Sequence, residues 1–281
     1  MKMKRIIAIL LPALLLLAAA CGGNPAPAAP ESAPEQTYPP ETQSAAESSA
    51  PQTHKPQQPQ ESTEEESMPQ EQSEPSVNVK LLYMGQSSVR ITTPEGRVIY
   101  VDPYAGDGYG PAADLVLITH GHYDHNRADL VANRNPECAI ITWAEALEGG
   151  EHRTFDLGFV TVEAVEAGNN PNHSIYSCVG YVLTFTNGVS VYFSGDTSKT
   201  QQMAQLAEKQ IDYAFFCCDG VYNMDTDEAA ECARLVGAKH NIPYHVIAQS
   251  GKYFDLSRAE LFNAPNRLII NEGEETELVK G

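Results

Sequence analysis

Thr119-His-Gly-His-Tyr-Asp-His125 places three imidazoles and one carboxylate within six consecutive residues of this 281-residue chain. The stretch follows Asp114-Leu-Val-Leu-Ile-Thr119, an apolar run that predicts a buried strand, so the donors lie where a strand gives way to a loop. Imidazole and carboxylate are ligands of zinc and related metals, and four donors this close cannot all face one ion without strain. The pattern predicts two adjacent metal ions. The alternative is a set of surface or capping histidines ahead of a helix.

The N-terminus has the pattern of an export signal. A basic start, Met1-Lys-Met-Lys-Arg5, precedes a run rich in leucine and alanine at residues 6–20, which is short for a transmembrane helix. The run ends in Ala-Ala-Ala-Cys21, which resembles a bacterial lipobox. Residues 1–21 are therefore expected to be a lipoprotein signal peptide with Cys21 as the lipid-attachment site, which places the protein outside the cytoplasm on the bacterial cell membrane. Ordinary secretion and an uncleaved anchor are the alternatives.

Residues 22–77 change in composition to proline, glutamate, serine and glutamine. They contain ten acidic residues against a single lysine, Lys55, and almost no large aliphatic residues. Such a segment cannot bury enough apolar surface to fold, and its charge and proline content favour an extended chain. We expect a disordered tether, in which His54 is a bystander.

Residues 78–281 are patterned throughout and are numerous enough for one well-buried domain, which we expect to be catalytic. The expected strands are residues 79–85, 88–92, 97–102, 114–119, 139–142, 159–165, 179–185, 189–194, 211–217, 242–247 and 267–270, and the expected helices are residues 126–133, 199–210, 227–240 and 256–263. Strands followed by alternating helices and strands support a mixed α and β domain with a core layer between covering helices.

Charge excludes one class of partner. The chain has a formal net charge of −19, and residues 78–281 alone carry 14 basic and 27 acidic side chains. This domain offers no basic stripe that could neutralise phosphates, so no nucleic-acid partner is expected. The chain also lacks the Ser-x-x-Lys and Gly-x-Ser-x-Gly nucleophile motifs, so a serine mechanism has no support.

Five cysteines remain once Cys21 is assigned to the lipid, an odd number that leaves at least one thiol unpaired. Cys217 and Cys218 are adjacent at the end of an expected strand. Because no Cys-x-x-Cys pair accompanies them, we interpret them as small buried residues rather than as a soft metal site.

The stretch at residues 119–125 resembles the His-x-His-x-Asp-His signature of the metallo-β-lactamase superfamily. Asp102-Pro103 upstream and Ser194-Gly-Asp-Thr197 downstream stand in the order of that superfamily, and the resemblance covers residues 79–275. The chain is most similar to the branch that contains ascorbate-6-phosphate lactonase, although Gln86 stands where that branch has the histidine of Gly-His-Ser. The resemblance implies an α+β fold, a four-layer αββα sandwich with a dinuclear site at one edge of two mixed sheets.

By this resemblance His120 and His122 would bind a first divalent ion. The third ligand of that ion is assigned to His173, because its loop lies between two expected strands ahead of the strand that carries Asp196. His152 is the competitor for this role. Asp196, at the end of its strand, would bridge the two ions.

Asp124 and His125 would bind the second ion by the same resemblance. Its last ligand should come from a strand near the C-terminus, and His245 stands in a Pro-Tyr-His sequence that resembles the Pro-x-His of the family. His240 is interpreted as the end of a helix, where positive charge is favourable. Asp102 is expected to accept the second ring N–H of a ligating histidine, and a turn carboxylate is the alternative.

The implied reaction is hydrolysis, because two ions about 3.5–4 Å apart supply a bridging hydroxide near neutral pH. Zn²⁺ is the expected ion, with Mn²⁺ or Fe²⁺ as alternatives, and Asp124, Asp196 and His245 are the expected catalytic residues. Tyr222 and Asn223 either contact the substrate or belong to a plain turn. The expected substrate is a small lactone, then a phosphodiester, then a small amide, and a β-lactam is not expected. The rival interpretation is a non-catalytic surface lipoprotein that binds metal or ligand.

Overall fold

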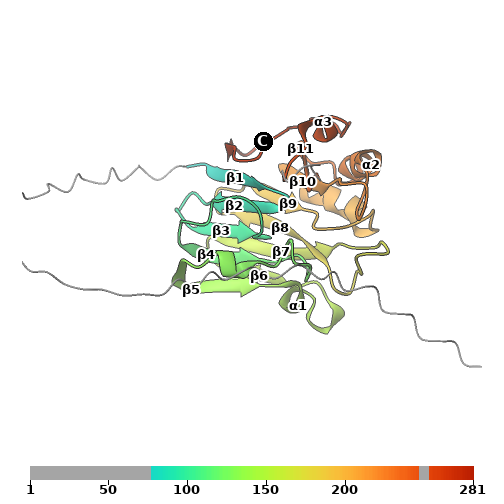
Figure 1. The fold of residues 1–281 in the computed structure, drawn as a ribbon. Coiled ribbons are helices and arrows are strands. Elements are labelled where there is room, and N and C mark those ends of the chain that lie inside the picture. The colour runs from blue at the N-terminus through green and yellow to red at the C-terminus, as the bar shows by residue number, and fades with distance from the viewer. Residues whose placement is uncertain (1–76, 247–252) are drawn as a thin grey trace, which may run out of the picture. The chain divides into compact units, whose positions relative to one another are not determined.

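Twelve β-strands form the framework of the chain in the computed structural model, which describes residues 77–246 and 253–281 (Figure 1). The expected signal peptide, the lipid-attachment residue Cys21 and residues 22–76 of the expected tether lie outside the described residues. Among the described residues, no helix combines the length and hydrophobicity that a bilayer span requires.

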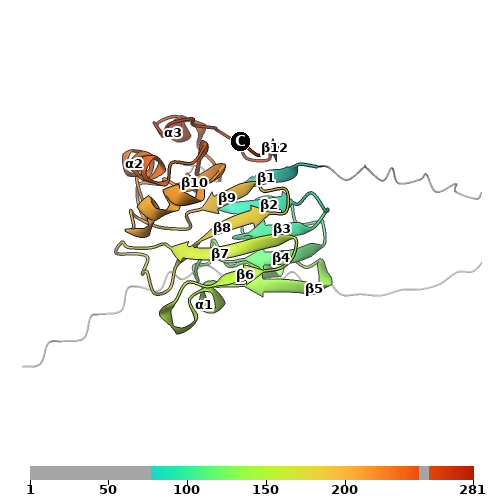
Figure 2. The same cartoon turned by 180° about the vertical axis from the view of Figure 1, so that it is seen from behind.

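The first sheet has the strand order β12-β1-β2-β3-β4-β5. Its strands are β1 (Val79–Gly85), β2 (Ser88–Thr92), β3 (Val98–Val101), β4 (Ala113–Leu117), β5 (Arg134–Ile141) and β12 (Glu275–Leu278). Pairing is antiparallel from β12 to β3, with Val79 opposite Leu278, and parallel from β3 to β5. Figure 2 shows β12 beside β1, so the last strand of the domain completes the sheet that its first strand begins.

The second sheet has the strand order β11-β10-β9-β8-β7-β6. Its strands are β6 (Thr154–Asp156), β7 (Val160–Glu166), β8 (Val179–Phe185), β9 (Ser190–Phe193), β10 (Tyr213–Cys217) and β11 (His240–Tyr244). Pairing is antiparallel from β6 to β9 and parallel from β9 to β11. Every residue of β10 is buried, as expected for a parallel strand that is covered on both faces.

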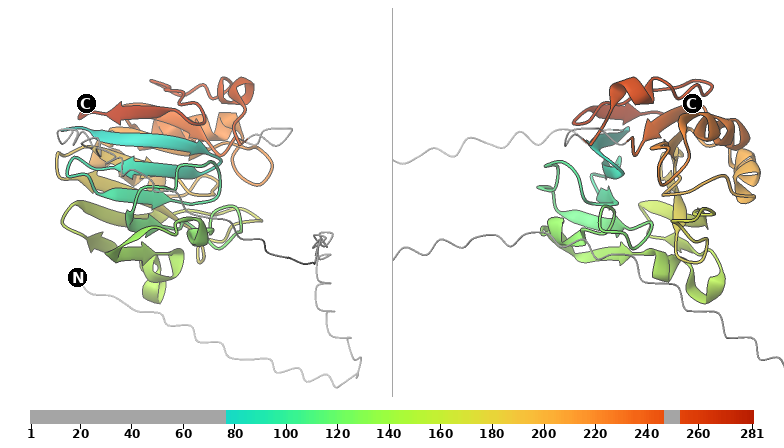
Figure 3. Two further views of the ribbon diagram at one scale, coloured as in Figure 1. Left: turned by 60° about the vertical axis from the view of Figure 1, so that its left-hand side comes forward. Right: turned by 45° about the vertical axis from the view of Figure 1, so that its right-hand side comes forward.

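The two sheets pack face to face, and side chains from both form one hydrophobic core (Figure 3). Leu81 and Ile91 of the first sheet belong to the same buried cluster as Val162 and Leu183 of the second. Helix α2 (Thr226–Val236) and the 3-10 helix η3 (Gln202–Lys209) contact each other and lie against the second sheet. The predicted α+β sandwich is therefore confirmed.

Two predicted helices in the middle of the chain were wrong in extent or type. Residues 126–133 contain only the 3-10 turn η1 (Ala128–Leu130), and β5 starts at once afterwards. Arg134 closes this turn, because its guanidinium donates to the carbonyls of Val131 and Ala128. The helix predicted at residues 199–210 is present as the shorter 3-10 helix η3 (Gln202–Lys209). Short α1 (Trp143–Ala146) and η2 (Glu148–Gly150) follow β5 and were not predicted.

The helix predicted at residues 227–240 ends at Val236. Gly237 adopts the left-handed conformation, with φ of 66°, and donates its N–H to the Ala233 carbonyl, which terminates α2. The interpretation of His240 as a helix end was therefore wrong. His240 is the first residue of β11, and its ring stacks on Tyr213 at 4.8 Å between centroids.

The C-terminal elements also differ from the prediction. The helix expected at residues 256–263 is α3 (Leu256–Ala259), and residues 267–270 form no strand beyond a single bridge between Asn241 and Arg267. The last strand is β12, whose sequence Glu-Thr-Glu-Leu shows no apolar run. Charged side chains are common on edge strands because they discourage further pairing, which is why hydrophobic pattern does not reveal this strand.

All described cysteines are free, namely Cys138, Cys178, Cys217, Cys218 and Cys232. This confirms that thiols stay unpaired in the domain. Cys217 and Cys218 are fully buried at the end of β10, as interpreted from the sequence.

Candidate metal centre

The predicted ligands meet at the edge where the parallel strands of both sheets end. The histidine-rich loop follows β4, Asp196 lies three residues beyond β9, and His245 is the residue after β11. His173 comes from the loop between β7 and β8. Ligands commonly bind outside the carboxyl ends of strands in α/β sheets, because the loops that leave parallel strands converge there. The architecture thus brings together all seven residues predicted as ligands.

The first group of donors consists of His120, His122 and His173, whose ligand atoms lie within 4.8 Å of one another. His173 Nε2 is 3.2 Å from His122 Nδ1. His120 and His173 are buried, whereas His122 is exposed to the pocket. His152, the competitor for the third position, belongs to none of the donor groups found among the described residues.

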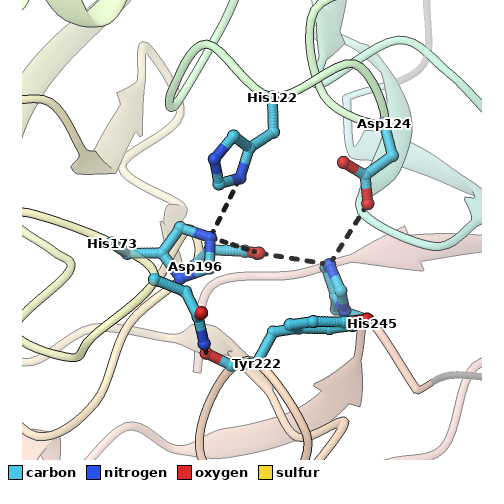
Figure 4. A pocket seen from close by; sticks show the side chains of 7 residues that line it. His122, Asp124, His173, Asp196, Tyr222 and His245 are labelled. Atoms are coloured by element: carbon cyan, nitrogen blue, oxygen red, sulfur yellow. Dashed lines mark hydrogen bonds and ion pairs between the residues drawn. The ribbon is translucent and has the colours of Figure 1, made fainter. Parts of the chain in front are cut away.

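The second group consists of Asp124, His125 and His245, again with ligand atoms within 4.8 Å of one another. Asp124 Oδ2 lies 3.8 Å from His125 Nε2 and 3.9 Å from His245 Nε2. His125 and His245 are buried, and the Asp124 side chain remains 38% exposed. The partly open carboxylate faces the pocket (Figure 4).

Asp196 lies between the two groups. Its Oδ1 is 3.4 Å from His125 Nε2. Its Oδ2 is 3.3 Å from the Nε2 atoms of both His173 and His245, as Figure 4 shows. Asp196, His120 and His125 form a third donor group of their own. One carboxylate thus contacts histidines that belong to both neighbouring donor groups, which is the placement that a bridging ligand needs.

Asp102 lies behind His125 and is fully buried. Its Oδ2 is 2.8 Å from His125 Nδ1 and accepts a hydrogen bond from Thr119 Oγ1, while its Oδ1 accepts the Thr119 N–H. This contact leaves His125 Nε2 directed at the donor cluster. The geometry is that expected from the sequence for a carboxylate that orients a ligating ring.

Asp219 has the same relation to His245, and sequence reasoning missed it. It is fully buried, and its Oδ2 is 3.3 Å from His245 Nδ1. Asn223 Nδ2 donates to Asp219 Oδ2 at 2.7 Å and to Asp196 Oδ2 at 2.8 Å. Asn223 therefore holds two carboxylates of the centre, whereas Tyr222 lines the pocket itself. The position of Asp219 in the sequence could have indicated this role, because Asp219 follows β10 closely, as Asp196 follows β9.

Gln86 is a second residue without a predicted role. Its carboxamide nitrogen is 3.0 Å from Asp124 Oδ2 and 2.9 Å from His245 Nε2. The sequence marked this position only as a departure from Gly-His-Ser.

Charges inside the cluster set the protonation of its rings. Burial and the neighbouring His125 lower the pKa of His120 to about 2, which keeps that ring neutral. Burial opposes charge on His125 too, but the carboxylates of Asp196 and Asp102 outweigh it and hold the pKa of His125 well above 6.5. Burial likewise opposes charge on His245, yet Asp196 and Asp219 raise its pKa to about 10. Binding of a cation to these two rings must therefore release protons.

The residues fit a divalent metal. His120 Nε2, His125 Nε2 and Asp196 Oδ1 are buried, and none of them has a hydrogen-bond partner among the described residues. Buried polar atoms are normally satisfied, and atoms that serve as metal ligands are the exception expected here. Imidazole nitrogen and carboxylate oxygen suit Zn²⁺, Fe²⁺ and Mn²⁺.

The cluster opens into a pocket of about 310 Å³. It is lined by His122, Asp124, Asn172, His173, Asp196, Tyr222 and His245. This volume suits a small molecule, and no lysine or arginine is among the lining residues.

A two-sheet α+β sandwich with a histidine and aspartate cluster at the edge of its sheets defines a class of metal-binding proteins, and comparison with known proteins gives the family. The family model described as "Beta-lactamase superfamily domain" matches residues 80–245, more than half of the chain. The chain belongs to the metallo-β-lactamase superfamily.

Relatives and solved structures agree with this assignment. A UPF0173 metal-dependent hydrolase of Chloroflexus aurantiacus is 32% identical over 202 residues, which cover 60% of this chain and 82% of that protein. One from Koribacter versatilis is 30% identical over 198 residues, which cover 59% of this chain and 84% of that protein. The crystal structure of a proposed metal-dependent hydrolase from Parabacteroides distasonis superposes with a TM-score of 0.58 at 26% identity and covers 70% of this chain and 94% of that one.

Proposed function

We propose that this metal-dependent hydrolase uses two divalent ions, most simply Zn²⁺, to hydrolyse a small lactone. The observation that supports two ions is the overlap of the donor groups: Asp196 contacts His173 on one side and His125 on the other. A single ion could not take ligands from both ends of such a cluster. The relatives named as metal-dependent hydrolases support the reaction class.

When bound, such ions polarise a carbonyl or phosphoryl oxygen and lower the pKa of a coordinated water to near neutrality. On the protein side, seven residues would hold them: His120, His122, Asp124, His125, His173, Asp196 and His245. Asp102 and Asp219 are placed to accept a hydrogen bond from Nδ1–H of His125 and His245, which keeps the Nε2 lone pairs available for ligation. Asp124, the most open carboxylate of the set, is placed to contact the nucleophile as well.

The lining of the pocket favours a lactone over a phosphodiester. Arginine and lysine are the usual side chains for phosphate recognition, and neither lines this pocket. Asn172 and the half-exposed Tyr222 stand at its wall and can contact a neutral substrate through an amide and an aromatic face. A phosphodiester, with the ions alone to bind its charge, is the second choice.

We also propose that Cys21 carries a lipid, so that the enzyme acts outside the cytoplasm at the bacterial membrane. The basic start, the apolar run and the Ala-Ala-Ala-Cys21 sequence support this localisation. Metabolic labelling with a fatty acid should mark the full chain, and Cys21→Ala should lose the label and leave the detergent phase. Labelling that persists in the variant would contradict the anchor.

The reaction is tested with the purified full chain. Metal analysis should find about two equivalents per chain, and a panel of lactones and phosphodiesters should show faster turnover of a lactone. Chelation should abolish turnover, and added Zn²⁺ or Mn²⁺ should restore it. A fully loaded protein that turns over no member of the panel would instead favour the non-catalytic lipoprotein.

A further inference from the structure

Gln86 is held rigidly beside the metal centre by its backbone. It occupies the tight turn between β1 and β2 and has a φ of 51°. Residues other than glycine, asparagine and aspartate rarely adopt this left-handed backbone conformation. Its N–H donates to the Tyr253 carbonyl, and its own carbonyl accepts from the His245 N–H and from Tyr83 Oη. Such conformations cost about 1–3 kcal/mol and persist where the surroundings fix them. The backbone of Gln86 is thus hydrogen-bonded directly to the backbone of His245, a predicted ligand.

The side chain of Gln86 is only 8% exposed and ends between two ligand atoms of the same donor group. Its Nε2 lies 3.0 Å from Asp124 Oδ2 and 2.9 Å from His245 Nε2. A ring nitrogen that gives its lone pair to a cation cannot also accept a hydrogen bond from an amide. The contact with His245 is therefore incompatible with an ion at the second position, and the buried carboxamide needs another arrangement.

A half-turn of the carboxamide resolves this conflict. The rotation exchanges Oε1 and Nε2, which have almost the same shape. Oε1 would then lie about 3 Å from both Asp124 Oδ2 and His245 Nε2, where Nε2 now lies. Around a five- or six-coordinate ion, neighbouring ligands can lie at right angles, and bonds of about 2.0–2.2 Å then place their atoms about 2.8–3.1 Å apart. The distances that surround the Gln86 amide match this spacing.

We propose that Gln86 supplies its amide oxygen as a further ligand at the position of Asp124, His125 and His245, which rests on the proposed two-ion function. That position then has two nitrogens and, counting Asp196, three oxygens. The position of His120, His122 and His173 has three nitrogens and one shared oxygen. Oxygen-rich sites favour Mn²⁺ and nitrogen-rich sites favour Zn²⁺, so the two positions should differ in metal preference.

The test is metal titration of the full chain after chelation, with Zn²⁺ and with Mn²⁺, by calorimetry and equilibrium dialysis. Gln86→Asn tolerates the left-handed backbone and keeps an amide, but it is one methylene too short to reach the ion. The second equivalent of metal should bind about 10–100-fold more weakly in Gln86→Asn, and the affinity for the first equivalent should be unchanged. Gln86→Glu keeps an oxygen at the same reach and should retain the second equivalent, because a cation offsets its repulsion from Asp124.

Gln210→Asn is the matched control, since Gln210 is an exposed glutamine with φ of 50° at the end of η3. It should bind both ions as the wild type does. If Gln86→Asn binds the second ion with wild-type affinity, the amide is no ligand. If Gln86→Glu loses the second equivalent as well, Gln86 acts through its N–H on Asp124, and the proposal is overturned. A wild-type chain that takes up one equivalent alone overturns the two-ion function itself, together with this proposal.

Discussion

Two histidines of the centre are held from behind by buried carboxylates. Asp102 contacts Nδ1 of His125, and Asp219 contacts Nδ1 of His245. In each case the carboxylate fixes the ring orientation and raises the basicity of the nitrogen that faces the cluster. The orientation of these two rings therefore depends on carboxylates that lie behind the donor cluster.

We predict that Asp219→Asn weakens metal binding about 10–100-fold at one position and leaves the other unchanged. The amide keeps the size of the side chain but cannot accept the His245 ring proton with the strength of a carboxylate. Isothermal titration with Zn²⁺ measures the change, and Asp107→Asn, at an exposed position, is the control. Unchanged affinity in Asp219→Asn would reduce Asp219 to a turn residue that accepts the Val221 and Tyr222 N–H groups.

Asp196→Asn should have a larger effect, because one carboxylate contacts histidines of both donor groups. Loss of its charge should lower the metal content of both positions and reduce turnover by about 10²-fold or more, with a much smaller change in melting temperature. Metal content, turnover and melting temperature, measured on the same preparation, test this prediction. Asp156→Asn, in the exposed strand β6, serves as the control. Two full equivalents with unchanged turnover in Asp196→Asn would show a purely structural carboxylate.

The seven residues predicted as ligands and the supporting carboxylate Asp102 could be found from the sequence, whereas Asp219 and Gln86 could not. Four ligands lie within residues 119–125, a local pattern that needs no knowledge of the fold. Asp219 and Gln86 both contact His245, which is 26 and 159 residues away in sequence. Their proximity to His245 results from the parallel pairing of β10 with β11 and from the turn after β1, and neither can be read from composition or periodicity.

At the scale of elements, Asp212 ties the start of β10 to the end of the chain. Its carboxylate is fully buried and contacts Lys239 Nζ and Lys280 Nζ, each at 2.9 Å. It also accepts the N–H groups of Ser190 and Gly281. Burial raises the pKa of Asp212, but these partners outweigh it and lower the pKa to about 2.

This lowered pKa predicts a stability difference that depends on pH. A carboxylate whose pKa is lower in the folded than in the unfolded state stabilises the fold above the unfolded value of about 3.9, and this contribution fades as pH falls towards the folded value. Asp212→Asn should cost about 1–2 kcal/mol at neutral pH, allowing for the partly exposed lysines. The difference from wild type should shrink below pH 4 and vanish only as the pH falls below about 2. Urea unfolding across this range measures it, and a constant difference would contradict the assignment.

Strands with an apolar pattern were predicted, and polar or terminal elements were not. The runs at β1, β8 and β10 are hydrophobic because they fill the core, so their positions follow from sequence. β6 and β12 are edge strands with mostly exposed residues, and tertiary pairing alone reveals them. The helices were overextended because periodicity does not register a stop such as Gly237.

At the scale of the whole molecule, each donor group draws on both sheets. His122 follows β4 of the first sheet, whereas His173 precedes β8 of the second. In the second donor group, Asp124 follows β4 of the first sheet and His245 follows β11 of the second. Bound metal would therefore connect the two layers of the sandwich, and its binding energy would add to the stability of their packing.

Removal of metal should accordingly lower the melting temperature. A ligand that binds only the folded state stabilises it by about 2.7 kcal/mol at a free concentration of 100 Kd. Calorimetry with and without chelator measures the shift, and returned Zn²⁺ should reverse it. Asp196→Asn should respond far less to chelator than wild type. Equal melting of the loaded and stripped wild type would show that the sheets pack independently of the ions.

The pairing of β1 with β12 places the first strand of the domain beside its last strand. Val79 and Leu278 are directly opposed, and residues 279–281 extend the chain by at most about 10 Å beyond that pair. A linker of about six residues should therefore join the two ends of the domain. New termini could then open between the exposed Gly149 and Gly150, where an added Cβ atom would meet no other atom within 4 Å. Such a circular permutant should melt cooperatively and keep its metal site, because the first and last strands are paired neighbours and joining them leaves both sheets unchanged.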